Sequence, residues 1–394
     1  MKQHFALILL LLLCSLLAAR AQSGLDDVLK SIETNNPTLR ANRQLAESQK
    51  LEARTGNYLA NPTVEYSQLW PKGNTEGSEN ELVVKQSFDF PSVYAHKNKL
   101  ARIKSQTSDL QYAAKRQEIL LNALETCQEI IFLKKQKALL DNRLAHTQKL
   151  EELYRKRLAS GDANQLELNK IQLEKINAQY ACRRNEATMR ARLENLQLMN
   201  GGMAIDLQTD EYPSLQQLPE FSTLEADYLS ADPALKGLTS ESEAAQREIK
   251  INRALSLPKF DIGYRRNGNS EEKLNGFCVG VSIPLWENKN TVKQAKAQAE
   301  YAQLNIADNT QVLKATLKEL YLQAQALQAS KEEYTQVLSA QRNEELLHKA
   351  LEAGQMTMTD YFTELFTLYD SIQNYLEIEK EYYNTIARLL QYRL

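Results

Sequence analysis

Glycine and proline are scarce in this sequence of 394 residues, which holds 13 glycines and 9 prolines. Between Pro91 and Gly201 there is no proline and a single glycine, Gly161. From Leu285 to the end there is again no proline and a single glycine, Gly354. Both residue types destabilise helix interiors, so their absence predicts two very long helical segments. Each segment is interrupted by one glycine, which indicates that the two interruptions have a common origin.

Cysteine and histidine are also few, with 4 residues of each. The cysteines beyond the N-terminal leader are widely spaced and odd in number, which argues against a disulfide framework. Three of the histidines, His96, His146 and His348, lie in helical segments among charged residues. Solvated side chains are the simpler interpretation for them, because no cluster with the spacing of metal ligands is visible. We therefore expect neither a metal site nor a cofactor.

An excess of one charge is missing as well, since 48 basic residues face 50 acidic ones and the net charge is −2. This balance does not favour binding to nucleic acid. The sequence shows no nucleophile motif, no phosphate-binding glycine loop and no set of His, Asp and Glu at ligand spacing. We expect a protein that is not an enzyme and does not bind nucleic acid.

What the sequence does contain begins with an apolar leader at residues 1–21. Lys2 gives a charged start, residues 5–17 form an apolar core too short to span a bilayer, and residues 19–21 (ARA) offer a small-x-small cleavage site. Lipid attachment at Cys14 is disfavoured by the bulky residue before it. The leader predicts export with a cleaved signal peptide.

The rest of the chain contains the same unit twice. The segment NNPTLRANRQLAESQKLEARTGNYLANPTVEY aligns without a gap with ADPALKGLTSESEAAQREIKINRALSLPKFDI at a shift of 196 residues. Pro37 then falls on Pro233, and Pro62 falls on Pro258. Further on, RLASGDANQLELN falls on ALEAGQMTMTDYF at a shift of 193 residues, so the two lone glycines occupy one position of a tandem repeat.

Each repeat has four parts: a helix opened by proline, a hairpin of alternating strands, a long helix and a returning helix. The long helices show apolar positions that step by four and three residues, as in coiled coils, and at about 1.5 Å per residue each would reach roughly 100 Å. The predicted signal peptide covers 1–21, and a linker or equatorial segment at 203–230 separates the two repeats. The first repeat covers 22–202, with its hairpin at 63–90, its long helix at 92–158 and its return helix at 164–200. The second repeat covers 231–394, with its hairpin at 259–285, its long helix at 287–353 and its return helix at 357–394.

The hairpin strands alternate between apolar and polar residues. Charged side chains such as Glu81, Lys85, Asp261 and Arg265 share one face, and aromatic residues stand near the strand ends. Strands of about ten residues with this pattern fit the wall of an outer-membrane barrel better than a sandwich, for which two hairpins supply too few strands. The residues expected to face lipid are Val64, Tyr66, Leu82, Val84, Phe88, Ile262, Tyr264, Val279, Val281 and Ile283.

Four strands cannot close a barrel, and lipid does not tolerate open strand edges. The chain is therefore expected to oligomerise, giving eight strands as a dimer or twelve as a trimer. Eight strands leave an interior only wide enough for side chains, so a charged, water-filled lining fits twelve better.

These motifs together resemble the TolC-like outer-membrane factors of Gram-negative efflux and type I secretion systems. The resemblance rests on the NPTLR and DPALK helix starts, the NPTVEYS and LPKFDIGY strand entries, the GVSIPLW strand exit and the tandem duplication. It implies a fold that is mainly α with a membrane β-barrel: a homotrimer in the outer membrane, with four strands per protomer in a twelve-stranded barrel. Long antiparallel coiled-coil helices would continue this barrel as a periplasmic α-barrel.

The function implied by this resemblance is that of a passive exit duct in a tripartite efflux system. Its partners would be outer-membrane lipid, a periplasmic adaptor protein and an inner-membrane pump, of the resistance-nodulation-division type rather than the ABC type. The expected cargo is metal ions or small toxic compounds. A type I secretion duct and a periplasmic coiled-coil structural protein without transport function are the alternatives.

The resemblance also places candidate site residues at the two glycine turns. Long helices descending from the membrane would turn at the periplasmic end, where the family docks its adaptor. The docking candidates are Arg157, Leu158, Gly161, Leu351 and Gly354.

Beyond each glycine comes an acidic residue, Glu167 in the first repeat and Asp360 in the second. The resemblance implies that these two acids form a ring of carboxylates that gates the tunnel. The alternative is that they only stabilise a helix start, where acidic side chains are favoured by the helix dipole.

Overall fold

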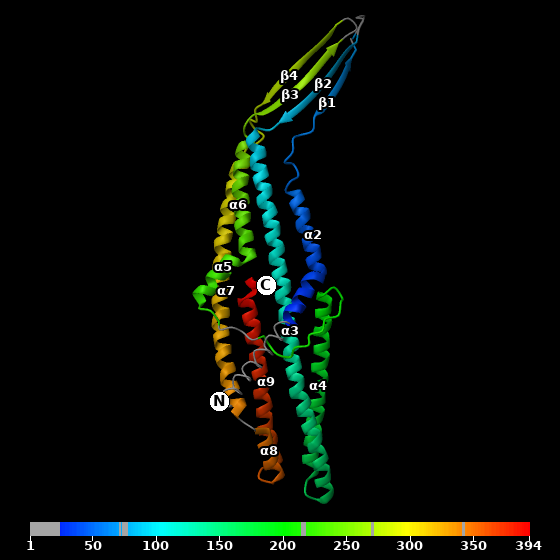
Figure 1. Cartoon of the computed structure of the whole chain (residues 1–394), viewed down its shortest axis with the longest axis vertical. Helices are drawn as coiled ribbons and strands as arrows, with labels where there is room; N and C mark the ends of the chain where they lie inside the picture. Colours follow the sequence, from blue (N-terminus) through cyan, green and yellow to red (C-terminus); the bar gives the residue numbers. More distant parts are fainter. Residues whose placement is uncertain (1–23, 71, 73–77, 214–217, 269–271, 341–342) are drawn as a thin grey trace, which may run out of the picture. The chain divides into compact units, whose positions relative to one another are not determined.

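The computed structural model describes residues 24–70, 72, 78–213, 218–268, 272–340 and 343–394 (Figure 1). The predicted signal peptide at residues 1–21 lies outside the described part of the chain. Two compact units are present, and each is treated by itself. Among the described residues, the tip unit comprises those of 24–40, Lys115–Ala231 and Lys314–Leu394, and the sheet unit comprises those of Ala41–Ala114 and Asp232–Leu313.

The helices and strands follow one another in the order expected for two repeats. None of the described helices is both long and apolar enough to cross a membrane. The elements are a helix at residues 24–35, α2 (Pro37–Glu52), β1 (Thr63–Leu69), β2 (Glu79–Phe88), α3 (Pro91–Ser160), α4 (Gln165–Met199), α5 (Phe221–Ala231), α6 (Pro233–Ala254), β3 (Lys259–Gly268), β4 (Lys273–Ser282), α7 (Thr291–Ala340), α8 (Asn343–Glu352), α9 (Met358–Leu389) and the short 3₁₀ helix η1 (Gln391–Arg393).

The four strands form one antiparallel sheet in the order β1-β2-β3-β4. The two hairpins join through β2 and β3, with Val84 opposite Tyr264. On the same face, Val64 lies opposite Val84, and Ile262 lies opposite Val279. Because side chains alternate along each strand, this register gathers the apolar positions of all four strands on one face and most of the charged positions on the other.

Helix α6 of the sheet unit begins as its sequence predicts. Pro233 occupies the first turn, and the carboxylate of Asp232 accepts a hydrogen bond from the backbone N–H of Leu235 at 2.9 Å. This cap satisfies a donor that has no partner inside the helix. The helix packs against α3 through small polar side chains, where the hydroxyls of Thr107 and Ser240 are 2.8 Å apart.

The tip unit is held by apolar clusters that line α3. The first, which we call the upper core, joins α3 to the N-terminal helix and the end of α4: Leu25, Val28, Ile32, Ala123, Cys127, Ile130, Ile131, Leu196, Leu207 and Tyr212. The second, which we call the tip core, joins α3, α4, α8 and α9 near the two turns: Leu150, Tyr154, Leu168, Ile171, Leu351, Met358, Tyr361, Phe362, Leu365 and Tyr369.

The two long helices differ in continuity. α3 runs for 70 residues without a break, close to the predicted 92–158. In the second repeat the helix expected at 287–353 starts only at Thr291, because residues 287–290 form turns in which Asn290 has a φ of 69°. α7 then ends at Ala340 and α8 begins at Asn343, so the described residues form two helices where one was predicted.

Candidate functional site

The turn after α3 is built around Gly161. Its φ is 81°, and its N–H donates to the carbonyl of Leu158 at 3.2 Å, while the N–H of Asp162 donates to the carbonyl of Arg157 at 2.8 Å. This pair of bonds is the Schellman motif, which ends a helix with a residue of left-handed conformation. A Cβ at Gly161 would meet nothing within 4 Å, so glycine is favoured here by its backbone conformation and not by lack of space.

The turn after α8 repeats this geometry at Gly354. Its φ is 68°, and its N–H donates to the carbonyl of Leu351 at 3.1 Å. The N–H of Gln355 donates to the carbonyl of Ala350 at 2.9 Å. The two lone glycines of the sequence therefore end two equivalent helices in the same way.

The two acidic gate candidates both lie in the first turn of the returning helix. Glu167 forms a capping box with Asn164: the Asn164 side chain accepts from the Glu167 N–H at 3.0 Å, and the Glu167 carboxylate accepts from the Asn164 N–H at 2.9 Å. In the second repeat the Thr357 hydroxyl donates to the Asp360 carboxylate at 2.6 Å and accepts from the Asp360 N–H at 3.1 Å. Both acids thus have a local role at a helix start.

The docking candidates differ in exposure: Gly161 and Gly354 are exposed, whereas the three larger side chains are half-buried or buried. Leu351 is only 3% exposed and belongs to the tip core, so its side chain offers little surface for docking, and its docking role stays a prediction. The position of Leu351 near Gly354 in the sequence suggested a docking role, but its side chain packs between the helices. Arg157 and Leu158 are half-buried, Arg157 over the ring of Tyr154 at 5.4 Å and Leu158 against the tip core.

An apolar stripe that the sequence analysis missed lies on the outside of α4. Its members are spaced by seven, three and four residues, the pattern of one helix face, and Leu166 at the turn is 78% exposed. The spacing of these residues in the sequence already indicates a stripe. However, α4 has enough apolar residues to form two stripes, and the sequence does not say which of them is exposed. The stripe consists of Leu166, Leu173, Ile176 and Tyr180.

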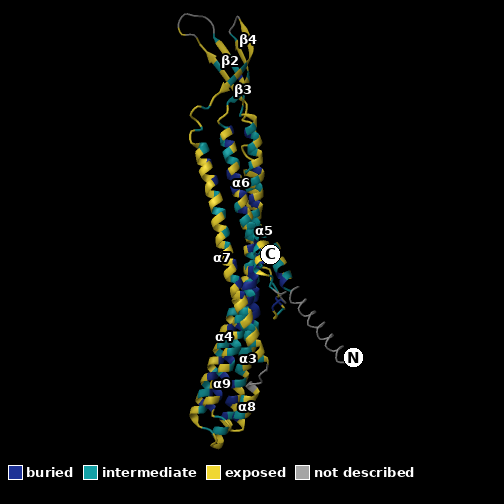
Figure 2. Cartoon of the chain, turned by 90° about the vertical axis from the view of Figure 1, so that its left-hand side faces the viewer, coloured by how far each residue is buried: buried dark blue, intermediate teal, exposed yellow. Residues whose placement is uncertain are grey.

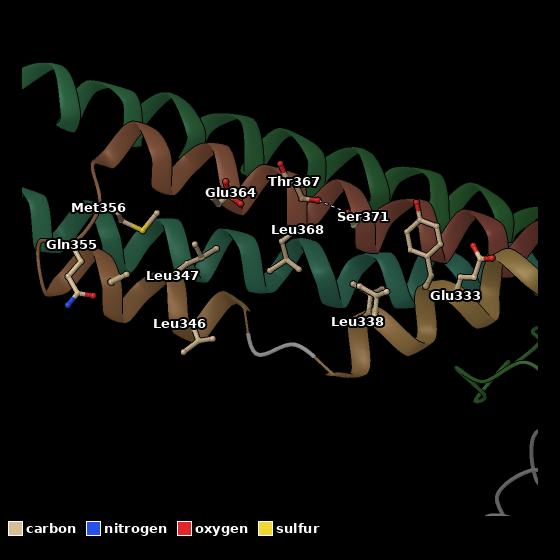
Figure 3. A pocket seen from close by; sticks show the side chains of 13 residues that line it. Glu333, Leu338, Leu346, Leu347, Gln355, Met356, Glu364, Thr367, Leu368 and Ser371 are labelled. Atoms are coloured by element: carbon tan, nitrogen blue, oxygen red, sulfur yellow. Dashed lines mark hydrogen bonds between the residues drawn. The ribbon is translucent and has the colours of Figure 1, made fainter.

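A groove of about 760 Å³ lies between the end of α7, α8 and α9. Figure 3 shows Leu347 and Leu368 along the groove between the helices, with Met356 and Gln355 near the turn and Glu333 at the α7 end. The lining is mostly apolar, with the carboxylates of Glu333 and Glu364 among it.

A histidine cluster sits where α3, α8 and α9 meet. The rings of His146 and His348 are in edge contact, with centroids 5.3 Å apart, and the hydroxyl of the fully buried Tyr361 forms a hydrogen bond with Nε2 of His146. His348 Nε2 lies 3.2 Å from the Glu352 carboxylate. The prediction that these two histidines are separate solvated side chains is therefore wrong. Sequence alone could not bring them together, because they are 202 positions apart and unrelated by the repeat.

Among the described residues, no group of three or more His, Cys, Asp and Glu side chains is arranged to hold a metal ion. The described cysteines carry no disulfide. Burial raises the pKa of the Cys127 thiol to about 12, so it stays protonated as an apolar core residue.

The sheet residues expected to face lipid share one face. Nine of the ten lie in the described strands on the apolar side of the register, and the tenth, Ile283, follows the end of β4 directly. Phe277 and Val279 of that face are 90% and 75% exposed. The opposite face carries an ion pair between Arg265 and Glu81 at 3.0 Å.

Comparison with known proteins yields one family match and several structural matches. Residues 226–392 match the model of the outer membrane efflux protein family. No curated protein matches the chain by sequence. A crystal structure of CusC, described in terms of transmembrane channel formation, has 17% identity and a TM-score of 0.79, covering 94% of this chain and 92% of that one.

Two further structures have the same fold. The outer membrane protein VceC of Vibrio cholerae has 14% identity and a TM-score of 0.78, with 95% and 97% coverage. The open state of the MtrE outer membrane channel of Neisseria gonorrhoeae has 13% identity and a TM-score of 0.70, with 94% and 88% coverage. These matches confirm the predicted fold class, and with the family match they confirm the resemblance to TolC-like outer membrane efflux proteins.

Proposed function

From the family match and the geometry of the sheet, we propose that this chain forms the outer-membrane exit duct of a tripartite efflux system. The duct is passive, and an inner-membrane pump and a periplasmic adaptor deliver its cargo. The observation that carries the proposal is the four-stranded sheet, which has one exposed apolar face. Within the described residues, its edge strands β1 and β4 each pair with a neighbouring strand on one side only.

The apolar face supports a position in lipid. Full burial of a Val, Ile or Phe side chain is worth about 1.5–3 kcal/mol, so a face with many such residues exposed is costly in water. Contact with hydrocarbon removes this cost. The exposed members are Val64, Tyr66, Val84, Ile262, Tyr264, Phe277, Val279, Val281 and Ile283.

The unpaired edges support assembly with further copies. β1 and β4 leave backbone donors and acceptors without ladder partners, which hydrocarbon does not tolerate. Pairing β4 of one copy with β1 of the next satisfies both edges. Three copies give twelve strands, a ring wide enough for water around charged residues such as Lys85 and Asp261.

The tip turns support docking of an adaptor, with Leu166 as a contact residue in addition to Arg157, Leu158, Gly161 and Gly354. The apolar face of the sheet and the apolar leader at residues 1–21 support a position in the outer membrane of a Gram-negative cell. We infer a pump of the resistance-nodulation-division type, with metal ions or small toxic compounds as cargo.

The test is to express the full chain, fractionate the cell envelope, and measure the mass of the detergent-extracted protein. We expect extraction from the outer membrane only with detergent, a mass of three chains, and ion-conducting events in planar bilayers. A water-soluble monomer would contradict the proposal and favour a periplasmic coiled-coil protein. Deletion of candidate pump genes, with metal and drug resistance as the readout, then tests the cargo.

A further inference from the structure

We propose that α4 of one copy of this chain packs against α7 and α8 of the next copy, and that ion pairing of Arg183 with Glu332 or Glu333 sets the register of this contact. The inference deepens the assembly of the proposed function and rests on it, because it states which helices meet when copies surround the tunnel. All residues that carry it lie in the tip unit.

The two repeats already meet once within the chain, where α9 of the second repeat packs against α3 of the first. We call this contact the inner seam. Arg143 of α3 lies over the rings of Phe366 and Tyr369 of α9, at 5.3 and 5.4 Å. Further from the turns, Leu139 of α3 packs against the apolar cluster that contains Leu376 of α9. The inner seam therefore buries one face of α9.

The equivalent face of α4 is exposed. α4 corresponds to α9 at the shift of 193 residues that aligns the two turns, so Ile176 is the equivalent of Tyr369 and Arg183 is the equivalent of Leu376. Tyr369 is 3% exposed, whereas Ile176 is 59% exposed. Leu376 is buried, whereas Arg183 is exposed. The face that α9 buries in the inner seam is thus uncovered on α4.

α7 and α8 correspond to α3, and their equivalent face is also uncovered. At the same shift, Arg143 falls on Gln336 and Leu139 falls on Glu332, and both of these equivalents are exposed. Val337, next to Gln336, lines the groove described above and is exposed as well. Each copy therefore presents both sides of a second seam.

These two faces do not meet within one chain. In the tip unit α3 contacts α4 through Arg143 and Glu174, and it contacts α9 through Lys135 and Glu379. α9 in turn contacts α8. Figure 1 shows α4 and α8 at opposite ends of this row of helices. A second copy supplies the missing neighbour for each of them.

The charges on the two faces are opposite, although their equivalents in the inner seam are leucines. Arg183 lies 22 residues after Gly161, and Glu332 lies 22 residues before Gly354. Helical residues at equal distances from their turns face each other when the turns of neighbouring copies are level. Glu333 adds a second carboxylate there. Within the described part of the chain, none of these three charged residues forms an ion pair.

Such a contact joins one face of the chain to a different face of the next copy, and contacts of this kind form a ring where the rotation closes. If the seam between copies matches the inner seam, three copies place six equivalent repeats around one axis. Leu166 stays outside the seam, because its equivalent Thr359 is exposed beside the inner seam. It remains free to contact an adaptor.

The experiment is cross-linking between copies in the detergent-extracted full chain. Ile176→Cys with Gln336→Cys places one thiol on each face, at the equivalents of Tyr369 and Arg143, in a Cys278→Ser background. A short bismaleimide should join these chains into covalent dimers and trimers on a denaturing gel, and neither single variant should do so.

A matched control keeps Ile176→Cys and moves the second thiol along α7. Gln323→Cys is also at an exposed position, but it lies 13 residues from Gln336, which is about 20 Å along a helix. This distance exceeds the reach of a short cross-linker, so the control pair should give no covalent oligomer. Equal yields from the two pairs would overturn the proposed register.

The ion pair is tested by charge reversal in the cross-linking variant. Arg183→Glu should lower the cross-link yield about fivefold, because like charges then face each other, and Glu332→Lys with Glu333→Lys should do the same. All three changes together should restore the yield, which a misfolded tip would not do. Arg190→Glu is the control, since Gln325 lies opposite it at the same register, and it should leave the yield unchanged. Failure of the combined variant to recover would overturn the ion pair.

The mass of the extracted protein separates this inference from the proposed function. A wild-type protein that is not a trimer contradicts the proposed function itself. A trimer in which Ile176→Cys with Gln336→Cys forms no covalent oligomer overturns the seam and leaves the proposed function standing. Maleimide labelling of Ile176→Cys that is blocked only when an adaptor is added would assign this face to the adaptor and would also overturn the seam.

Discussion

The two repeats end in the same turn but reach it through helices of different character. In α3, whose residues are all described, no large apolar side chain is exposed, and buried residues recur along its length. α7 is largely exposed in the single chain, as its yellow colour in Figure 2 shows. Its exposed apolar residues are Tyr301, Leu304, Val312, Leu322 and Val337. Duplication has preserved the turn while one helix became the packed interior of a protomer and the other kept an open surface.

The two repeats differ in burial because equivalent residues contact different neighbours. Leu158 and Leu351 are equivalent residues beside equivalent glycines, yet Leu158 is half-buried and Leu351 is buried in the tip core. The turn is fixed by hydrogen bonds within six residues, so both copies form it. Burial is fixed by neighbours elsewhere in the chain, so it differs between copies. For α7, the exposed surface fits contact with a further copy of the chain in the proposed trimer.

The largest expected effect tests whether the two hairpins meet the same environment. Val84 and Val279 lie in β2 and β4, the second strands of the two hairpins, and share the apolar face. Val84→Lys and Val279→Lys should each cost about 2–4 kcal/mol near the bilayer midplane and reduce the detergent-stable trimer. The measurement is the fraction of trimer that survives heating.

Ser67→Lys is the control for this pair, because Ser67 lies on the other face, opposite Glu81. It should leave the trimer intact. Equal loss from all three variants would show that the apolar face does not meet lipid. Loss from Val84→Lys alone would show that the two repeats are not equivalent in the barrel.

The second prediction concerns the turns, where the repeats agree most closely. Gly161→Ala and Gly354→Ala should each lower the free energy of unfolding of the tip by about 1–2 kcal/mol, because both positions need a positive φ and neither lacks space. This free energy of unfolding is measured by denaturant titration, with hydrogen exchange at the tip as the readout. Gly276→Ala, in open space without a positive φ, should change stability by less than about 0.5 kcal/mol. Clearly unequal costs at the two turns would mean that the turns are not interchangeable.

The third prediction exploits a place where the turns differ. Leu166 is 78% exposed, and its equivalent in the second repeat is Thr359. If the adaptor contacts the first turn through this leucine, Leu166→Thr should weaken adaptor binding about tenfold, the effect of losing about 1.4 kcal/mol of apolar contact. Thr359→Leu should have no such effect. Unchanged binding in Leu166→Thr, measured by surface immobilisation of the trimer, would place the contact elsewhere.

The sequence was sufficient for features that local chemistry determines. Glycine spacing predicted both turns, alternation predicted the strand faces, and the NPTLR and DPALK starts predicted the helices that follow Pro37 and Pro233. Features set by distant contacts were not predictable. The contact of His146 with His348 depends on how α3 packs against α8, and the exposed stripe on α4 depends on which of two apolar stripes the neighbours cover.

The smallest expected effect separates two roles of Glu167 and Asp360. Both carboxylates accept hydrogen bonds at a helix start, and such a cap is worth about 1 kcal/mol, which explains their presence without any gate. Glu167→Gln and Asp360→Asn keep an oxygen that can accept these bonds, so stability should fall by only a few tenths of a kcal/mol. They do remove the charge. If three copies of each acid converge at the tunnel mouth, the neutral double variant should lose cation selectivity and block by multivalent cations in single-channel recordings, because a narrow ring of carboxylates is poorly screened. Glu167→Ala with Asp360→Ala should lose the same selectivity and also the caps. A neutral variant that conducts and selects like the wild type would show that the two repeats share these acids as helix caps alone.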